Sequence, residues 1–325
     1  MLKLVYILAA SHSGSTLLSM LLNSHPQIVT TGELKLSPRA IGDTSRYRCS
    51  CGQLIKQCIF WQKIKEYMTK KGVEFDIAKA RMDYSDMNSQ YVCRLLRPLH
   101  RGFLLENLRD SALKLSPVWR KQLPEIQKRI TALISTILEI SGAKVAIDSS
   151  KTELRLKYLL RNPDLDIKVI HLVRDGRGVA LTYMNPAEFA DARSPNLRAG
   201  GIGGSRDKER LTMSQAAHEW KRSNEAAQNV LNQLDRSRKI EIRYEQMCKD
   251  IKNTLMILFQ FIGLKTDTSN TDFSSVEHHV IGNGMRLDNT SEIKLDERWK
   301  SVLTKNDLNI FEREAGVLNH RFGYE

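Results

Sequence analysis

The 325-residue sequence has no apolar run of about 18 residues, the length that a membrane-spanning helix needs. It also has no internal repeat and no low-complexity tract, and its 41% hydrophobic and 27% charged residues are ordinary globular usage. These absences exclude a mostly disordered, collagen-like or coiled-coil chain. The apolar residues 1–10 run directly into a Ser/Gly turn, so we interpret them as a buried strand and not as a signal peptide.

Cysteine is scarce and odd in number. Three of the five cysteines, Cys49, Cys51 and Cys58, lie close together, which is not a secreted disulfide framework, so we expect a reducing cytoplasm. The C-x-C-x6-C spacing offers three soft metal ligands, and Cys93 or a histidine could supply a fourth. Because this spacing is not a standard zinc signature, reduced packing cysteines or an occasional disulfide are the favoured interpretation, with zinc as the alternative.

Negative charge is the minority sign. Lysine and arginine number 50 against 37 acidic residues, which gives a net charge of +13. Such a charge implies an anionic partner: a nucleotide, a nucleic acid, an acidic glycan or an anionic lipid surface. Aromatic residues are only 7% and the basic residues are dispersed, so nucleic-acid binding is disfavoured.

The order of apolar segments predicts an α/β fold with a central parallel sheet flanked by helices. Helical segments separate the predicted strands, which cover residues 4–8, 27–31, 144–147, 167–173 and 239–243. We expect a single domain over residues 1–325, with a largely helical insertion at about 58–141 and a mobile loop at about 186–212. In such sheets ligands bind at the carboxyl ends of the strands.

The first candidate site follows the first predicted strand. The turn Ser11-His12-Ser13-Gly14-Ser15-Thr16 leads into a helix, and such a turn directs backbone N–H groups towards an anion. The lysine of a Walker A loop is absent before Thr16, which disfavours a magnesium-dependent nucleotide triphosphatase. A helix cap followed by a core helix would explain the same residues, and a small-molecule P-loop kinase is an alternative.

The second candidate site follows the fourth predicted strand. Arg174 stands at the strand end, Thr182 follows eight residues later, and Arg177 is a further cation between them. An arginine and a hydroxyl in this arrangement can clamp a phosphate, although a solvated Arg-Asp turn would look the same. Two anion sites on one sheet edge predict a ligand with two separated anionic groups.

Together these segments resemble the sulfotransferases that use 3′-phosphoadenosine 5′-phosphosulfate (PAPS), in particular bacterial members and, around the cofactor loops, tyrosylprotein sulfotransferases. The resemblance spans residues 4–34, 143–183 and 239–299. It implies a P-loop-like three-layer fold, with residues 11–16 around the 5′-phosphosulfate and Arg174 with Thr182 on the 3′-phosphate. It also implies that Tyr244 lies near the nucleotide and that Arg286 supplies another cation to the 3′-phosphate.

The resemblance also implies the catalytic residues. Glu33, in a Gly-Glu segment that follows a His-Pro pair, is similar to the general base of tyrosylprotein sulfotransferases, although Leu34 replaces that family's second acidic residue. Lys151 is expected on the leaving phosphate or the sulfuryl group. His12 stands where most relatives have lysine or arginine, and we expect it to donate a hydrogen bond to the leaving oxygen. Without the resemblance, Glu33 would be interpreted as a capping or salt-bridged carboxylate and Lys151 as a surface lysine.

The expected reaction is transfer of a sulfuryl group from PAPS to a hydroxyl or amine, with no metal required. The acceptor, a small molecule, a glycan or a peptide, is not readable from the sequence; neither is the oligomeric state. Residues 62–140 and 193–210 are expected to shape the acceptor pocket. Because His12 and the single acid Glu33 depart from the family pattern, a catalytically inactive, nucleotide-binding member is an alternative.

Overall fold

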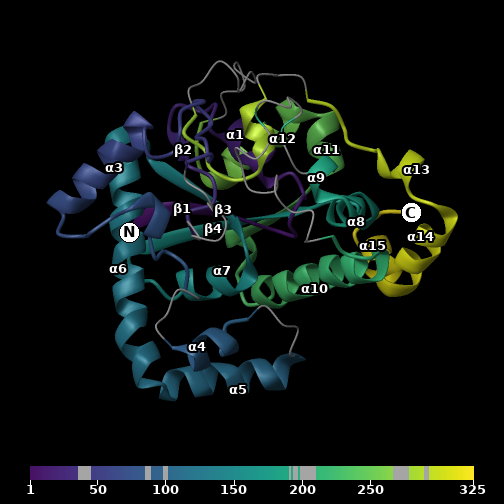
Figure 1. The fold of residues 1–325 in the computed structure, drawn as a ribbon, viewed down its shortest axis with the longest axis horizontal. Coiled ribbons are helices and arrows are strands. Elements are labelled where there is room, and N and C mark those ends of the chain that lie inside the picture. The colour runs from purple at the N-terminus through teal and green to yellow at the C-terminus, as the bar shows by residue number, and fades with distance from the viewer. Residues whose placement is uncertain are drawn as a thin grey trace.

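The computed structural model describes residues 1–35, 45–84, 89–97, 102–189, 192, 197, 210–265, 278–288 and 293–325. Within these residues a parallel five-stranded sheet has the order β2-β3-β1-β4-β5 and forms the middle of the molecule (Figure 1). The strands are β1 Leu2–Ala9, β2 Ile28–Thr30, β3 Val145–Lys151, β4 Leu165–Val173 and β5 Lys239–Arg243. Each predicted strand is therefore confirmed.

Helices lie on both sides of the sheet, and the α/β class is confirmed. Their bounds are α1 Ser15–Leu22, α3 Ile59–Lys70, α4 Gln90–Leu95, α5 Gly102–Leu115, α6 Pro117–Ser141, α7 Glu153–Leu159, α8 Gly176–Met184, α9 Pro186–Phe189, α10 Met213–Leu231, α11 Tyr244–Lys249, α12 Ile251–Ile262, α13 Trp299–Val302, α14 Lys305–Phe311 and α15 Val317–Arg321. In Figure 1, α1, α11 and α12 cover one face of the sheet, and α6, α7 and α10 lie on the other.

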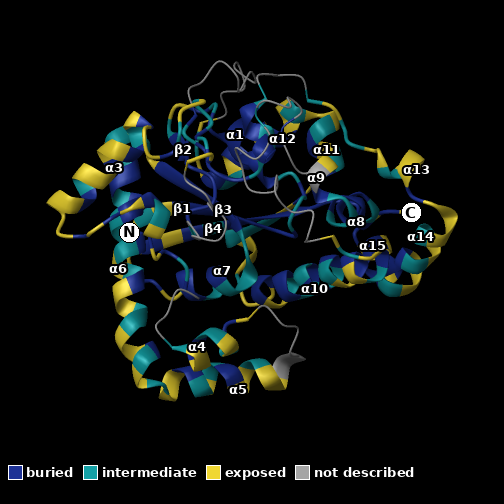
Figure 2. Ribbon diagram, in the orientation of Figure 1, coloured by how far each residue is buried: buried dark blue, intermediate teal, exposed yellow. Residues whose placement is uncertain are grey.

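The central strand β1 shows how the layers form. Residues 4, 6 and 8 of β1 enter a core shared with α3, α6 and α7, and residues 5, 7 and 9 enter a second core shared with α1 and α12. Successive side chains of a strand point to opposite faces, so a continuous apolar run is what a strand covered on both faces requires. The strands β1, β3 and β4 and the helix α1 are accordingly mostly buried, as Figure 2 shows.

The segment between β2 and β3 is largely helical in its described parts. Its longest helix, α6, begins after the N-cap Ser116, whose hydroxyl accepts from the Trp119 N–H, and ends at Gly142 in the left-handed conformation. The apolar stripe of this helix faces the core: Ile126, Ile130, Leu133, Ile134 and Ile137 are buried, and Leu138 is partly buried.

The C-terminal part forms a third core around Trp220 of α10, against α8, α14 and α15. Near the end of the chain, α14 ends at Phe311, and the backbone continues as a π-helical turn over Glu312–Gly316 and passes into α15. Most of the Gly- and Arg-rich loop at 193–210 lies outside the described residues. In the described part of the chain, no helix is both long and apolar enough to cross a membrane.

Candidate active site

A cavity of about 800 Å³ opens at the carboxyl ends of β1, β3 and β4. It is also lined by α8, by α10 and by the described residues 283–298. Most of the predicted site residues line it, although they come from distant parts of the sequence: Ser11, His12, Gly14, Ser15, Thr16, Glu33, Lys151, Arg174, Thr182 and Tyr244. Ser13 and Arg286 are not among the lining residues.

The loop between β1 and α1 presents hydrogen-bond donors at the start of the helix. Gly14, the N-cap of α1, has a φ of 89°, and a Cβ at this position would lie 2.6 Å from the ring of Tyr244, so only glycine fits. No side chain in the described residues caps α1, so its first N–H groups remain available to a ligand. The Oγ of buried Ser13 has no hydrogen-bond partner among the described residues. The turn therefore carries the donors that an anion would satisfy.

His12 is held in an uncommon backbone conformation. Its φ is 65°, in the left-handed region that costs energy for residues other than glycine, and the same holds for Lys151 at 70°. The ring of His12 packs edge-on against Tyr183, with ring centroids 5.0 Å apart. Both strained residues line the cavity, which is where backbone strain concentrates in proteins that bind ligands.

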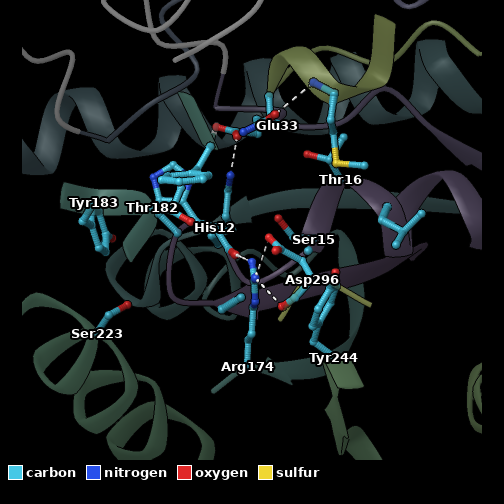
Figure 3. A pocket seen from close by; sticks show the side chains of 18 of the residues that line it. His12, Ser15, Thr16, Glu33, Arg174, Thr182, Tyr183, Ser223, Tyr244 and Asp296 are labelled. Carbon is cyan, nitrogen blue, oxygen red and sulfur yellow. Dashed lines mark hydrogen bonds and ion pairs between the residues drawn. The ribbon is translucent and has the colours of Figure 1, made fainter. Parts of the chain in front are cut away.

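Arg174 joins the two predicted anion-binding segments. It follows β4, is only 6% exposed, and its Nη1 donates to the backbone oxygen of His12 at 2.9 Å. Its Nη2 donates to the Asp296 carboxylate at 2.9 Å, and the guanidinium lies 4.6 Å from the centre of the Tyr244 ring. Figure 3 shows Arg174 among these three residues. The loops after β1 and β4 thus meet at one place.

Electrostatics at this point favour charged Asp296 and neutral Tyr244. Burial by itself raises the pKa of Asp296, but the hydrogen bonds from Arg298 and the charge of Arg174 outweigh it and hold that pKa well below its usual range. Burial raises the pKa of the Tyr244 phenol. Asp296 therefore neutralises Arg174, the cation that the sequence predicts to bind a phosphate.

The remaining residues of this segment differ in position. Thr182 of α8 is buried, lines the cavity, and its hydroxyl donates to the Gly178 oxygen at 3.1 Å. Arg177 is not among the lining residues, because its side chain pairs with Asp175 at 2.7 Å and lies 4.1 Å from the Trp299 ring centre. Of the two arginines after β4, only Arg174 reaches the cavity.

Glu33 and Lys151 form an ion pair at the cavity wall. Lys151 Nζ lies 2.6 Å from Glu33 Oε1, and the two side chains are 14% and 8% exposed. Gly32 places Glu33 because a Cβ at position 32 would lie 2.0 Å from the backbone oxygen of Ile281, and its φ of 84° suits glycine. Lys35 Nζ approaches the other oxygen of Glu33 at 3.7 Å. The pairing keeps a carboxylate and two ammonium groups together.

Asp148 holds the backbone around this pair. From the sequence, Asp148 could orient Lys151 or cap the next helix. The N-cap residue of α7 is Thr152, so Asp148 does not occupy that position. Its Oδ1 accepts from the Leu34 and Ser150 N–H groups at 3.1 and 2.9 Å, and its Oδ2 accepts from Arg155 Nε at 3.0 Å. It therefore fixes the residue after Glu33 and the residue before Lys151.

Arg286 lies outside the cavity lining, and its guanidinium contacts backbone carbonyls. Its buried guanidinium donates to the backbone oxygens of Val280, Gly282, Asn283 and Arg48, and it lies 5.0 Å from the Tyr47 ring centre. These contacts tie the 280–286 turn to the segment at 47–48. The structure does not bring Arg286 to the cavity, because its donors are directed at carbonyl groups of the turn that carries it.

Several residues that line the cavity were not predicted from the sequence. Asp296 is one, and α10 supplies Glu219, Arg222 and Ser223. Ser223 and Tyr183 are labelled in Figure 3, on the side of the cavity away from Tyr244. The apolar periodicity of α10 predicts a helix, but it does not indicate which polar residues face a cavity built from distant strands.

Comparisons with known proteins identify the family of the chain and its fold. Residues 5–268 match the model of the sulfotransferase family. Among solved structures, the sulfotransferase domain from the curacin biosynthetic pathway is 19% identical with a TM-score of 0.53, covering 100% of this chain and 99% of that one. The domain from the Synechococcus PCC 7002 olefin synthase is 16% identical over 99% and 95% of the chains (TM-score 0.48), and a mouse sulfotransferase complexed with PAP is 13% identical over 96% and 84% (TM-score 0.45).

No curated protein is significantly similar to the chain. The likeness to the curacin-pathway domain shows a shared fold, which confirms the P-loop-like three-layer architecture. The family model covers most of the sequence, from β1 past the end of α12. This chain therefore belongs to the sulfotransferase family.

Proposed function

We propose that this sulfotransferase takes its sulfuryl group from PAPS and transfers it to a hydroxyl or amine of a small-molecule, glycan or peptide acceptor. One observation carries the proposal: the two segments expected at opposite ends of the nucleotide line one cavity and are joined by the hydrogen bond from Arg174 to the His12 oxygen. A nucleotide with phosphates at its 3′ and 5′ positions needs two such anion sites in one cavity.

The residues present fit this donor. The N-terminus of α1 and the hydroxyl of Ser13, which have no side-chain cap and no partner within the described residues, suit the 5′-phosphosulfate, with Ser11, Ser15 and Thr16 as further hydroxyl donors. Arg174 and Thr182 would hold the 3′-phosphate, and the neutral ring of Tyr244 would lie beside the nucleotide. Arg286 has no part in this assignment, because its donors are directed at backbone carbonyls.

When bound, PAPS supplies an activated sulfuryl group on a phosphate leaving group. Glu33 acts as the general base: its carboxylate takes the proton from the acceptor hydroxyl or amine as the new bond to sulfur forms. Lys151 and His12 donate hydrogen bonds to the phosphate oxygen on which negative charge develops as the old bond to sulfur breaks. The ion pair of Glu33 with Lys151 holds the base next to the cation that stabilises the leaving group.

The test is a thermal-shift comparison of PAPS, its desulfated product PAP, and ATP. We expect stabilisation by PAPS and PAP but not by ATP, because binding to the folded state raises the melting temperature. Arg174→Met should abolish the shift. Arg177→Met is the matched control, because Arg177 is three residues away and does not line the cavity. Stabilisation by ATP alone would overturn the proposal in favour of a small-molecule kinase.

A second measurement separates an active enzyme from an inactive nucleotide-binding member. The purified chain is incubated with PAPS and a panel of phenols, alcohols, amines, acidic glycans and peptides, and PAP release is followed. Release of PAP that depends on an acceptor supports the proposed activity. Tight PAP binding with no transfer to any member of the panel would favour the inactive alternative.

A further inference from the structure

A second cluster of chemically reactive side chains lies outside the active-site cavity. Cys49, Cys51, Cys58 and His279 each direct one ligand atom to a common point, and these four atoms lie within 4.8 Å of one another. Cys49 and Cys58 are fully buried, and Cys51 and His279 are half-buried. The cluster joins the start of α3 to a segment more than 200 residues further along the chain.

Three distances within the cluster match those between the ligands of a tetrahedral zinc site. Zinc binds thiolate sulfur at about 2.3 Å and imidazole nitrogen at about 2.0–2.1 Å, so neighbouring ligands of a tetrahedron are separated by about 3.8 Å between two sulfurs and about 3.5 Å between sulfur and nitrogen. The sulfurs of Cys51 and Cys58 lie 3.7 Å apart. His279 Nδ1 lies 3.5 Å from Cys58 Sγ and 3.8 Å from Cys49 Sγ.

A disulfide does not fit these positions. Its sulfurs would be about 2.05 Å apart, and all three thiols of the cluster are free. The histidine also argues against simple packing cysteines, because its ring nitrogen is directed at the sulfurs of both buried cysteines.

The surrounding residues hold the ligands in place. The Ser50 hydroxyl donates to the His278 oxygen at 2.6 Å and accepts from the Val280 N–H at 2.8 Å, so it binds the backbone on both sides of His279. Phe60 stacks on the His279 ring with centroids 4.4 Å apart and planes 5° apart. Gly52, at a φ of 85°, closes the turn after Cys51. Such outer contacts orient metal ligands before the metal arrives.

From this geometry we propose that Cys49, Cys51, Cys58 and His279 form a structural zinc site. Four protein ligands leave no open position for water or substrate, so the ion would stabilise the fold and take no part in sulfuryl transfer. Binding of zinc displaces the thiol protons to solvent, which leaves three thiolates and one neutral imidazole on the metal.

Backbone hydrogen bonds connect the segment that carries His279 to the segment that carries Glu33, the proposed base. Directly after His279, the Ile281 N–H donates to the Thr31 oxygen at 2.9 Å, and the Ile281 oxygen accepts from the Glu33 N–H at 3.4 Å. Zinc would therefore anchor the segment that supports Glu33 to the start of α3. Loss of the metal should lower stability and loosen this wall of the cavity.

The first experiment measures metal content. The chain is purified under reducing conditions, incubated with zinc, freed of excess metal and assayed by mass spectrometry; we expect about one zinc per chain. Cys51→Ser tests the site with the least disturbance to packing, because Cys51 is the half-buried cysteine of the three, and it should reduce the zinc content at least tenfold. Cys93→Ser is the matched control and should retain wild-type zinc, because Cys93 is not among the four ligands.

Cobalt provides a second readout on the wild-type chain that does not depend on any variant folding. Cobalt in a tetrahedral site with three thiolates gives intense visible bands and a sulfur-to-metal charge-transfer band, and added zinc should abolish both. The proposal is overturned if the reduced wild-type chain holds substantially less than one zinc, if Cys51→Ser retains wild-type zinc, or if cobalt gives only the weak spectrum of an octahedral aquo ion. These results do not depend on PAPS binding, so they fail independently of the proposed function.

Discussion

Asp296 competes with the ligand for Arg174, and removing its charge should tighten nucleotide binding. The Asp296 carboxylate already accepts from the Arg174 guanidinium at 2.9 Å, so a 3′-phosphate would meet a cation whose charge and one of whose donors are partly taken. Hydrogen bonds to charged groups contribute about 1.5–3 kcal/mol, and about 1.4 kcal/mol is a factor of ten in affinity. Because the Asp296 side chain is 21% exposed and keeps Arg298 as a partner, the lower end applies. Asp296→Asn should therefore tighten PAP binding about tenfold.

Titration calorimetry with PAP at low salt measures this effect. Glu297→Gln is the matched control, because it removes the same charge at the next residue. Glu297 lines the same cavity, but its side chain pairs with exposed Lys300 at 2.6 Å. Its effect should stay within about threefold, as expected for a charge in a solvent-screened pair. If Asp296→Asn binds PAP no more tightly than Glu297→Gln, Asp296 orients Arg174 for the ligand and does not compete with it.

Three further substitutions test the catalytic residues and their support. Glu33→Gln should lower the rate of transfer to any acceptor that the wild type uses by about 10²–10⁴-fold, because it removes the base, while PAP affinity in calorimetry stays close to wild type. Asp148→Ala should lower the free energy of unfolding in urea by about 3–5 kcal/mol, because it leaves Arg155 buried and unpaired; a loss below about 1 kcal/mol would contradict this. If His12 donates to the leaving oxygen as a cation, turnover should fall as it loses its proton, and His12→Arg should extend activity to higher pH; an unchanged alkaline limb would contradict that role.

The local pattern of the sequence was sufficient for the sheet and for the two anion-binding segments. A strand covered on both faces needs a continuous apolar run, and a parallel strand presents the residues that follow it at one edge of the sheet. The residues after β1 and β4, among them Gly14 and Arg174, could therefore be placed at one site before their distance was known. The same argument placed Glu33 and Lys151 at the ends of their strands.

The partners of these residues could not be predicted, because they come from segments far away in the sequence. Asp296 is 122 residues from Arg174 and His279 is 230 from Cys49, and no local periodicity links such positions. The family resemblance predicts a nucleotide contact for Arg286. In the structure its guanidinium instead donates hydrogen bonds to backbone carbonyls of the turn at 280–286.

The sequence by itself determined which segments become strands and which polar residues follow them, because these depend on the hydrophobicity and conformational preferences of neighbouring residues. Only the tertiary structure decided that Asp296 pairs with Arg174 and that one face of α10 lines the cavity. It also decided that His279, and not Cys93, completes the cysteine cluster. The physical reason is that hydrogen bonds, ion pairs and metal ligands act over a few ångströms. Their partners are therefore set only when the packing of the sheet and helices brings distant segments together.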